Sequence, residues 1–136
     1  MNYTQNGFII SDDKALIQAD RVHEMLSKTY WAAQRPFEAN LKAIENSLCF
    51  GAYKYNVQVG FARVMTDYAT TFYLCDVVVE EEYRGNGLGR EMMKLIMKNE
   101  ELSGLVGILY TRNAHKLYEQ FNFESVEGVF MRKASN

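Results

Sequence analysis

Three glycines at alternate positions give this chain its clearest candidate for chemistry. Gly85, Gly87 and Gly89 follow a β-branched run that ends at Val79, and a segment with helical periodicity, residues 91–98, comes after them. Glycines let a backbone curl so that successive N–H groups point inward, and the start of a helix adds partial positive charge. Because strand, glycine turn and helix follow in that order, the sequence predicts a site for a phosphorylated ligand.

Two common phosphate loops do not match this spacing. A Walker loop needs Lys-Ser or Lys-Thr after its last glycine, whereas Arg90 and Glu91 follow Gly89. A dinucleotide loop needs G-x-G-x-x-G, usually on the first strand of its unit, whereas these glycines recur at every second residue past mid-chain. Neither a nucleoside triphosphatase nor a dinucleotide-binding protein is therefore expected.

The spacing that remains is R-x-x-G-x-G, formed by Arg84, Gly87 and Gly89. It resembles the pyrophosphate loop of the GNAT superfamily of acyl-CoA-dependent N-acyltransferases. The lead-in from Val77 to Arg84 also resembles the strand ending and short turn of that family. The whole run from strand to helix carries the resemblance, since a glycine cluster alone would be a weak signal.

A second block, residues 111–123, resembles the family's later motif, N-x-x-A-x-x-L-Y-x-x-x-G-F. It departs from that motif in two places, because Ala114 directly follows Asn113 and because Asn122 replaces the glycine. The position of Asn122 calls for a left-handed backbone after a helix, where Asn is the second choice after Gly. Together the two blocks cover about a third of the chain.

Length and composition indicate the broad class of protein. The 136 residues (15.7 kDa) fit a single domain spanning 1–136, and a hydrophobic content of 48% is enough for a core. A net charge of -2 argues against a nucleic-acid surface, and no apolar run is long enough to span a bilayer. No signal peptide is visible, so a cytoplasmic protein is expected. Cys49 and Cys75 lie in apolar surroundings and are interpreted as small buried hydrophobes, not as a disulfide or metal site.

Hydrophobic periodicity divides the chain into helical and extended segments. Ser11 is expected to cap a first helix, and Pro36 to begin a second one. Aromatic and β-branched runs in the centre predict three antiparallel strands. The predicted strands are 7–10, 48–53, 57–65, 71–79, 105–111 and 129–133, and the last two helices are 91–98 and 113–120.

This order of elements is similar to the GNAT fold. The resemblance implies an α/β fold with a mixed, mostly antiparallel sheet, flanking helices and one splayed pair of parallel strands. The splayed strands would be the one that ends at Val79 and the one that ends near Thr111. The gap between them would admit the pantetheine arm of the cofactor.

By the same resemblance, the cofactor is acetyl-CoA, the acetyl thioester of coenzyme A. The strand end would pair with the pantetheine amides, and the glycine turn would hold the pyrophosphate. The expected cofactor-binding residues are Val77, Val78, Val79, Arg84, Gly85, Asn86, Gly87, Leu88, Gly89, Arg90, Asn113 and Lys116. For Asn113 a helix cap stays open as an alternative, and for Lys116 a solvated helix face.

Two residues are candidates for the chemistry itself. Tyr118 sits where the family often places a tyrosine near the thioester sulfur, and a phenol there can give a proton to the departing thiolate. Asp76 is an acidic residue in an apolar strand, where it would share a face with Leu74 and Val78 and where burial would raise its pKa. It is a candidate base, although a buried structural hydrogen bond explains it at least as well, and Glu80 is a second candidate.

Residues for the acceptor are expected in two places. Trp31 and Arg35, between the first two helices, are interpreted as a pocket for an aromatic or acidic acceptor. The other side would be lined from the central hairpin, by Arg63, Asp67, Tyr68 and Tyr73. No motif specifies which amine would be accepted.

The leading hypothesis is an N-acetyltransferase that moves an acetyl group from acetyl-CoA to a primary amine of a small molecule or peptide by direct attack. One alternative is a non-catalytic CoA-binding sensor or assembly subunit, and another is a structural α/β domain that uses the glycine loop only as a turn. No nucleic-acid or membrane partner is expected. The apolar residues 129–131 are candidates for a homodimer contact.

Overall fold

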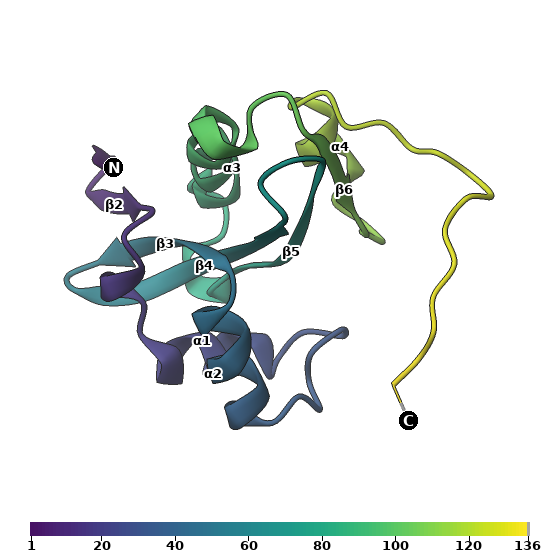
Figure 1. Cartoon of the computed structure of the whole chain (residues 1–136). Coiled ribbons are helices and arrows are strands. Elements are labelled where there is room, and N and C mark those ends of the chain that lie inside the picture. The colour runs from purple at the N-terminus through teal and green to yellow at the C-terminus, as the bar shows by residue number, and fades with distance from the viewer. Residues whose placement is uncertain (136) are drawn as a thin grey trace.

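A six-stranded sheet forms the centre of the computed structural model, which describes residues 1–135 (Figure 1). Its strands lie side by side in sequence order, and neighbours are antiparallel except for the parallel last pair. The strands are β1 (Asn2–Gln5), β2 (Phe8–Ser11), β3 (Leu48–Lys54), β4 (Val57–Thr66), β5 (Thr71–Val79) and β6 (Val106–Leu109). This arrangement confirms the predicted α/β class with a mixed, mostly antiparallel sheet.

Helices cover both faces of the sheet. Figure 1 shows α3 on one side and α1 with α2 on the other. The helices are α1 (Ala19–Leu26), α2 (Phe37–Glu45), α3 (Leu88–Lys98) and α4 (His115–Glu119), with 3₁₀ turns η1 (Lys14–Leu16), η2 (Glu81–Tyr83) and η3 (Glu100–Leu102). Within the described residues, no helix is both long and apolar enough to cross a membrane.

Each face of the sheet has its own hydrophobic core. Met92 and Ile96, on the inner side of α3, are fully buried in the core of one face. Val22 and Leu26, one turn apart on α1, are buried with Ile44 of α2 in the core of the other face. Burying each such side chain contributes roughly 1.5–3 kcal/mol, so both helix layers are fixed by their apolar stripes.

Two hairpin turns use residues with a left-handed backbone. Asn6 and Gly7 have φ values of 51° and 82°, and Tyr55 and Asn56 have values of 50° and 65°. Positive φ at both central residues gives a turn whose twist matches that of the paired strands. The first of these turns pairs β1 with β2, and β1 is a strand that the sequence analysis missed even though Asn-Gly is a hairpin signal.

The first helix begins later than predicted. Ser11 pairs with both β1 and β3, and its hydroxyl accepts a hydrogen bond from the Asp13 N–H at 3.0 Å. Asp13 in turn accepts from the Ala15 N–H at 2.9 Å and caps η1, and α1 starts only at Ala19. The predicted helix cap at Ser11 is therefore wrong, because the sheet extends to that residue.

A β-bulge in β5 changes which side chains face each core. The pairing of β5 with β4 shifts by one residue between Cys75 and Val78, and Asp76 within this stretch has a φ of 55°. Because an extra residue reverses the alternation of side chains, Leu74 packs in the α3 core and Val78 in the core of α1 and α2. The prediction that Leu74, Asp76 and Val78 share one face is therefore wrong.

The parallel strands separate just before this bulge. β5 and β6 pair through residues 71–74 and 106–109, and no pairing follows beyond Leu74 and Leu109. The bend that a bulge imposes on its strand accounts for the separation. The predicted splayed pair is confirmed, and in the described part of the chain residues 75–79 of β5 have no neighbouring strand on the side away from β4.

The predicted last strand, 129–133, is wrong for the described residues. Within residues 1–135 the chain forms no strand after β6, and its C-terminal segment (yellow in Figure 1) runs past β6, apart from the sheet. The last backbone hydrogen bond toward the C-terminal end joins the Phe123 N–H to the Tyr118 carbonyl at 3.3 Å. A strand needs a neighbour to complete its ladder, and this segment has none in residues 1–135.

Asn122 occupies the left-handed position that the sequence analysis assigned to it, with a φ of 69°. A residue with a Cβ costs about 1–2 kcal/mol in that conformation, less for Asn and little for Gly. We therefore expect Asn122→Ala to lower the free energy of unfolding in urea by about 1 kcal/mol and Asn122→Gly to keep or slightly raise it. An equal loss in both variants would show that the Asn122 side chain, not its backbone, sets the stability.

Candidate active site

A cavity of about 150 Å³ opens where β5 and β6 separate. Its walls come from the loop between α1 and α2, the bulged part of β5, the segment after β6, and α4. The lining residues are Tyr30, Trp31, Tyr73, Leu74, Cys75, Asp76, Val77, Leu109, Tyr110, Thr111, Asn113, Ala114 and Tyr118. Five of these thirteen residues are aromatic, and Asp76 is the one carboxylate among them.

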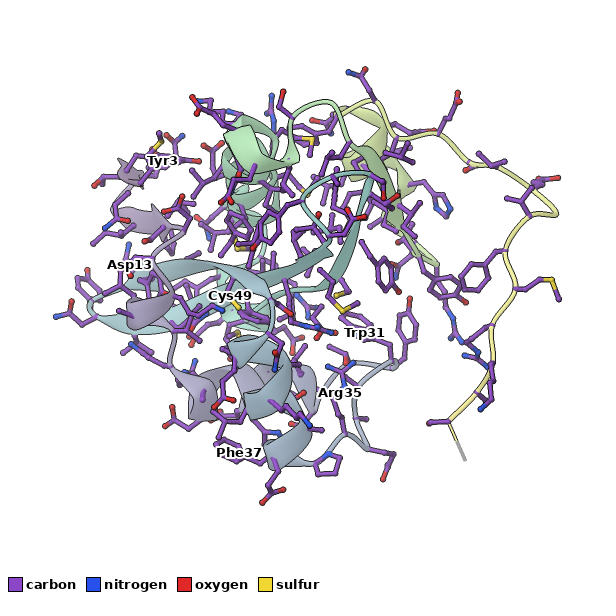
Figure 2. All side chains as sticks on the ribbon, in the orientation of Figure 1. Tyr3, Asp13, Trp31, Arg35, Phe37 and Cys49 are labelled. Carbon is purple, nitrogen blue, oxygen red and sulfur yellow. The ribbon has the colours of Figure 1, made fainter. Side chains whose placement is uncertain are left out.

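The Asp76 carboxylate accepts four hydrogen bonds. Its Oδ1 accepts from Trp31 Nε1 at 2.9 Å and from Arg35 Nη2 at 3.3 Å. Its Oδ2 accepts from Arg35 Nη1 at 2.7 Å and from Arg63 Nε at 3.0 Å. Figure 2 shows Trp31 and Arg35 on the loop between α1 and α2, beneath the sheet. Four bonds fill the acceptor capacity of a carboxylate, so Asp76 joins this loop to β4 and β5 and has no lone pair left for a ligand.

The pKa of Asp76 moves in the direction opposite to the predicted one. Burial raises this pKa, but the hydrogen bond from Arg35 and the charges of Arg63 and Arg35 outweigh burial. The net effect holds the pKa of Asp76 below its ordinary value of 3.8. The predicted raised pKa is therefore wrong, because partners far away in sequence supply two guanidinium groups.

The network of Asp76 continues away from the cavity. Arg63 Nη1 donates to the Ser47 hydroxyl at 3.1 Å, and Arg35 Nη1 donates to Asn40 Oδ1 at 3.2 Å. The Asn40 amide nitrogen lies 2.9 Å from Nδ1 of His23 on α1. Both arginines are thus bonded within the protein, and neither lines the cavity.

The other residues predicted for the acceptor fall in different places. Trp31 and Tyr73 line the cavity, as expected. Asp67 lies in the turn between β4 and β5, where it accepts hydrogen bonds from the N–H groups of Ala69 and Thr70 at 2.9 and 2.8 Å. The hydrogen bonds from Thr70 and Ala69 hold the pKa of Asp67 well below its usual range. Asp67 therefore shapes a turn, and neither it nor its exposed neighbour Tyr68 lines the cavity.

Tyr118 presents a neutral phenol to the cavity. Its side chain is 8% exposed, and burial, together with the nearby Tyr30 phenol, raises the pKa of Tyr118 to about 12. The Tyr118 hydroxyl makes no hydrogen bond within residues 1–135. Among the fully buried side-chain nitrogen and oxygen atoms of these residues, only the Tyr53 hydroxyl lacks a partner. The Tyr118 oxygen is therefore not fully buried and can be reached from the cavity. A protonated, unbonded phenol at this position can serve as a proton donor.

The glycine turn before α3 presents a row of unpaired N–H groups. Within the described residues, no N–H from Gly85 to Arg90 donates to a protein acceptor. Gly85 and Gly87 have φ values of 87° and 74°, and a Cβ added to either would meet nothing within 4 Å. Left-handed glycines beside a helix start form a concave nest for anions. The geometry therefore fits a pyrophosphate group.

Side chains brace this turn and leave its N–H groups free. Arg84 Nε donates to the Val79 carbonyl at 3.3 Å, and Asn86 Nδ2 donates to the Tyr83 carbonyl at 2.8 Å. Gly89 lies against Leu117 of α4, since a Cβ there would be 3.6 Å from the leucine methyl group. The start of α3 is thus next to the helix that carries Tyr118.

Three further candidates take up other positions. Asn113 lines the cavity but does not cap α4, because the Thr111 hydroxyl accepts the Ala114 N–H at 3.0 Å. Lys116 is on the exposed side of α4 and does not line the cavity. Glu80 accepts hydrogen bonds from Arg21 and Lys28 of the α1 region at 3.3 and 3.1 Å, with each of its oxygens facing one cation.

Tyr30, Tyr110 and Thr111 are cavity residues that the sequence analysis did not select. The Arg112 guanidinium lies 4.3 Å above the Tyr30 ring, which ties the loop after α1 to the segment after β6. The sequence offered only their position as a signal, since Tyr110 and Thr111 end the predicted strand 105–111, which was expected to splay from its neighbour.

Comparisons with known proteins agree with this fold. The family model described as acetyltransferase (GNAT) domain matches residues 45–125, more than half of the chain. A Gibberella zeae protein is 34% identical over an alignment of 123 residues, and the match covers 76% of this chain and 68% of that protein. A solved GNAT-family structure from Xanthomonas campestris has a TM-score of 0.90 and 36% identity, covering 97% of this chain and 96% of that one. Both are named "putative acetyltransferase".

A third similar protein, from Prochlorococcus marinus, is named an uncharacterized N-acetyltransferase. It is 27% identical over 106 residues, which cover 74% of this chain and 58% of that protein. The chain therefore spans somewhat more than half of this relative's length.

A mixed sheet opened between parallel strands, with a glycine nest at the start of the next helix, defines an acyltransferase of the GNAT type. The chain belongs to the GNAT acetyltransferase family, as the family match and the two relatives above 30% identity show. The resemblance drawn from the sequence blocks is thus confirmed.

Replacing Asp76 tests whether its carboxylate holds the site together. Asp76→Asn leaves two guanidinium groups without a counter-charge, so we expect a loss of about 3–5 kcal/mol in the free energy of unfolding in urea. Asp20→Asn, the same change on the surface of α1, is the control and should cost little. A loss below 1 kcal/mol for Asp76→Asn would contradict the assigned role.

The same carboxylate predicts a dependence of stability on pH. Because the folded-state pKa of Asp76 lies below its unfolded value of about 3.8, its contribution is complete well above that pH. The contribution is lost as pH falls through the folded-state pKa. Thermal unfolding from pH 7 to pH 2 should show wild type losing stability more steeply than Asp76→Asn below about pH 4. Parallel curves for the two proteins would refute this linkage.

Proposed function

We propose that this protein transfers an acetyl group from acetyl-CoA to a primary amine of a small molecule or peptide. Two chemical features beside one gap in the sheet support this proposal. The free N–H groups from Gly85 to Arg90 suit a pyrophosphate, and the Tyr118 phenol stands nearby on α4, beside Leu117 against Gly89. A donor with a phosphate end and a thioester end suits both features.

The donor would lie along the unpaired edge of β5. Residues 75–79 have no strand on that side, so their backbone groups are available to the amides of a pantetheine arm. The glycine nest would hold the pyrophosphate, and Arg84 and Arg90 would add positive charge near it. The residues proposed to hold acetyl-CoA are Val77, Val78, Val79, Arg84, Gly85, Asn86, Gly87, Leu88, Gly89, Arg90, Asn113 and Lys116.

Tyr118 would act as the general acid. Attack of the amine nitrogen on the thioester carbon breaks the C–S bond, and Tyr118 Oη gives its proton to the departing sulfur. A pKa of about 12 keeps this phenol protonated at neutral pH before the step. The phenolate would then recover a proton from the cationic nitrogen formed by the attack, so that the amine proton ends on the thiol.

The acceptor would enter the aromatic cavity in its neutral form. Trp31 and Tyr73 stand on two of its walls, and a volume of about 150 Å³ suits a small amine or the end of a peptide. Asp76 accepts four hydrogen bonds and Glu80 faces two cations, so we assign neither carboxylate as the base. Asp76 is proposed to position Trp31 in the acceptor wall.

The lack of a free carboxylate beside the cavity also favours one alternative, a CoA-binding sensor that does not turn over. Thermal unfolding with saturating acetyl-CoA separates a binding protein from a purely structural one. A ligand at about 100 times its dissociation constant adds about 2.7 kcal/mol, or several degrees, while NAD and ATP should add nothing. Steady release of free thiol with a panel of amines then distinguishes the enzyme from the sensor. No rise with acetyl-CoA would contradict the proposed function.

Removing one oxygen tests the acid role of Tyr118. We expect Tyr118→Phe to lower kcat by about 10²-fold or more and to change KM for acetyl-CoA little, because the ring still fills its place. Tyr68→Phe removes an equivalent hydroxyl from the exposed turn after β4 and should match wild type. A kcat for Tyr118→Phe within twofold of wild type would exclude Tyr118 as the acid.

A further inference from the structure

Within residues 1–135, the acceptor cavity offers no free negative charge. Asp76 is the one acidic residue in its lining, and the Asp76 carboxylate accepts hydrogen bonds from Arg35 and Arg63 at 2.7 and 3.0 Å. Two guanidinium groups against one carboxylate leave this cluster with a surplus of positive charge. Because Asp76 and Arg63 are only 5% and 8% exposed, water and salt screen this surplus weakly. An ammonium group inside the cavity would therefore find no carboxylate with which to pair.

A third guanidinium group stands at the rim of this cavity. Arg112 lies between Thr111 and Asn113, both of which line the cavity, and its guanidinium carbon is 4.3 Å from the centre of the Tyr30 ring in the cavity wall. In the described part of the chain, the Arg112 side chain forms no salt bridge with a carboxylate. A guanidinium has five N–H donors in a planar fork that fits a carboxylate. Arg112 therefore presents an unpaired cation within reach of an anionic group on the acceptor.

The Tyr30 ring connects this cation to the proposed general acid. Contact with an aromatic ring restrains a guanidinium without occupying its N–H donors. Tyr30 also lies close to Tyr118, since its phenol contributes to the raised pKa of Tyr118, and both tyrosines line the cavity. A small molecule whose anionic group pairs with Arg112 would therefore extend past Tyr30 toward Tyr118, where the acetyl group would be transferred.

We propose that the acceptor is a small primary amine that also carries a carboxylate, and that Arg112 binds this carboxylate at the rim of the cavity. Such an acceptor narrows the proposed acetyl transfer, on which this assignment rests, to amino acids and similar compounds. An aromatic or acidic acceptor was expected at Trp31 and Arg35, but both terminal nitrogens of Arg35 donate to Asp76. Arg112 has no such partner within residues 1–135, so it supplies the cation that Arg35 cannot.

The same charges disfavour a diamine. Its second ammonium group would lie among guanidinium groups at a site whose described residues offer no free carboxylate, and like charges close together cost free energy. Positive surroundings also lower the pKa of an ammonium ion, which favours the neutral amine that attacks the thioester. This effect suits a site in which neither Asp76 nor Glu80 is assigned as the base. A cavity of about 150 Å³ limits the acceptor to a short carbon chain.

Matched acceptors test the assignment by turnover. In a panel of amino acids, each is paired with its own amide, which lacks the negative charge. We expect Arg112→Gln to lower kcat/KM for the acids at least about tenfold and for the amides less than about twofold. Comparing variant with wild type for each compound cancels the different basicities of the amines. Lys42→Gln, which removes an exposed cation from α2, is the control and should match wild type with both kinds of acceptor.

Fluorescence measures acceptor binding without turnover. Trp31 is the one tryptophan of the chain and lines the cavity, so an acceptor bound there should change its emission. With coenzyme A present, the acids should give a saturable response in wild type, and Arg112→Gln should need at least about tenfold higher concentrations. Arg112→Lys keeps the charge without the planar fork, so its affinity should fall between the two.

The two measurements separate this assignment from acetyl transfer itself. Acids that bind through Arg112 but receive no acetyl group would support the carboxylate site and contradict acetyl transfer. An equal loss for acids and amides in Arg112→Gln would show that Arg112 only braces Tyr30, and this result would overturn the assignment. A wild type that neither binds nor acetylates the acids in preference to their amides would overturn it as well.

Discussion

One buried carboxylate fixes the geometry on which the rest of the site depends. Asp76 sits in the bulge of β5 with a left-handed backbone, a conformation that costs about 1–2 kcal/mol for a residue with a Cβ. Hydrogen bonds from Trp31, Arg35 and Arg63 offset this strain and the desolvation of the charge. Because these donors come from the loop after α1 and from β4, the carboxylate holds three parts of the chain at the point where β5 leaves β6.

Two stretches of backbone beside this separation are open to a ligand. Within residues 1–135, residues 75–79 have no strand on the side away from β4, and the N–H groups from Gly85 to Arg90 at the start of α3 donate to no protein acceptor. The proposed donor would pair with both stretches. The Tyr118 phenol lines the cavity at that gap, and burial keeps it protonated at neutral pH, as the proposed general acid requires.

Local patterns in the sequence predicted most of the fold and about half of the site. The central strands, the glycine turn and the left-handed Asn122 follow from residues within a few positions of one another. The bulge was not predictable, because buried residues still alternate along β5 and conceal the extra residue. The prediction of a raised pKa for Asp76 was wrong for a related reason, since its partners Arg35 and Arg63 lie 41 and 13 residues away. The prediction of a last strand was wrong because a strand forms only beside a pairing partner, and the sequence of the segment does not show whether one is present.

Amide hydrogen exchange, resolved by residue and compared with and without coenzyme A, would locate the donor on the protein. We expect slower exchange for the N–H groups from Gly85 to Arg90 and for residues 75–79, with the opposite edge of the sheet, β1, unchanged. Protection at these two stretches would show that the donor lies in the gap beside the Asp76 bulge. Binding of coenzyme A without protection there would show that the donor lies elsewhere.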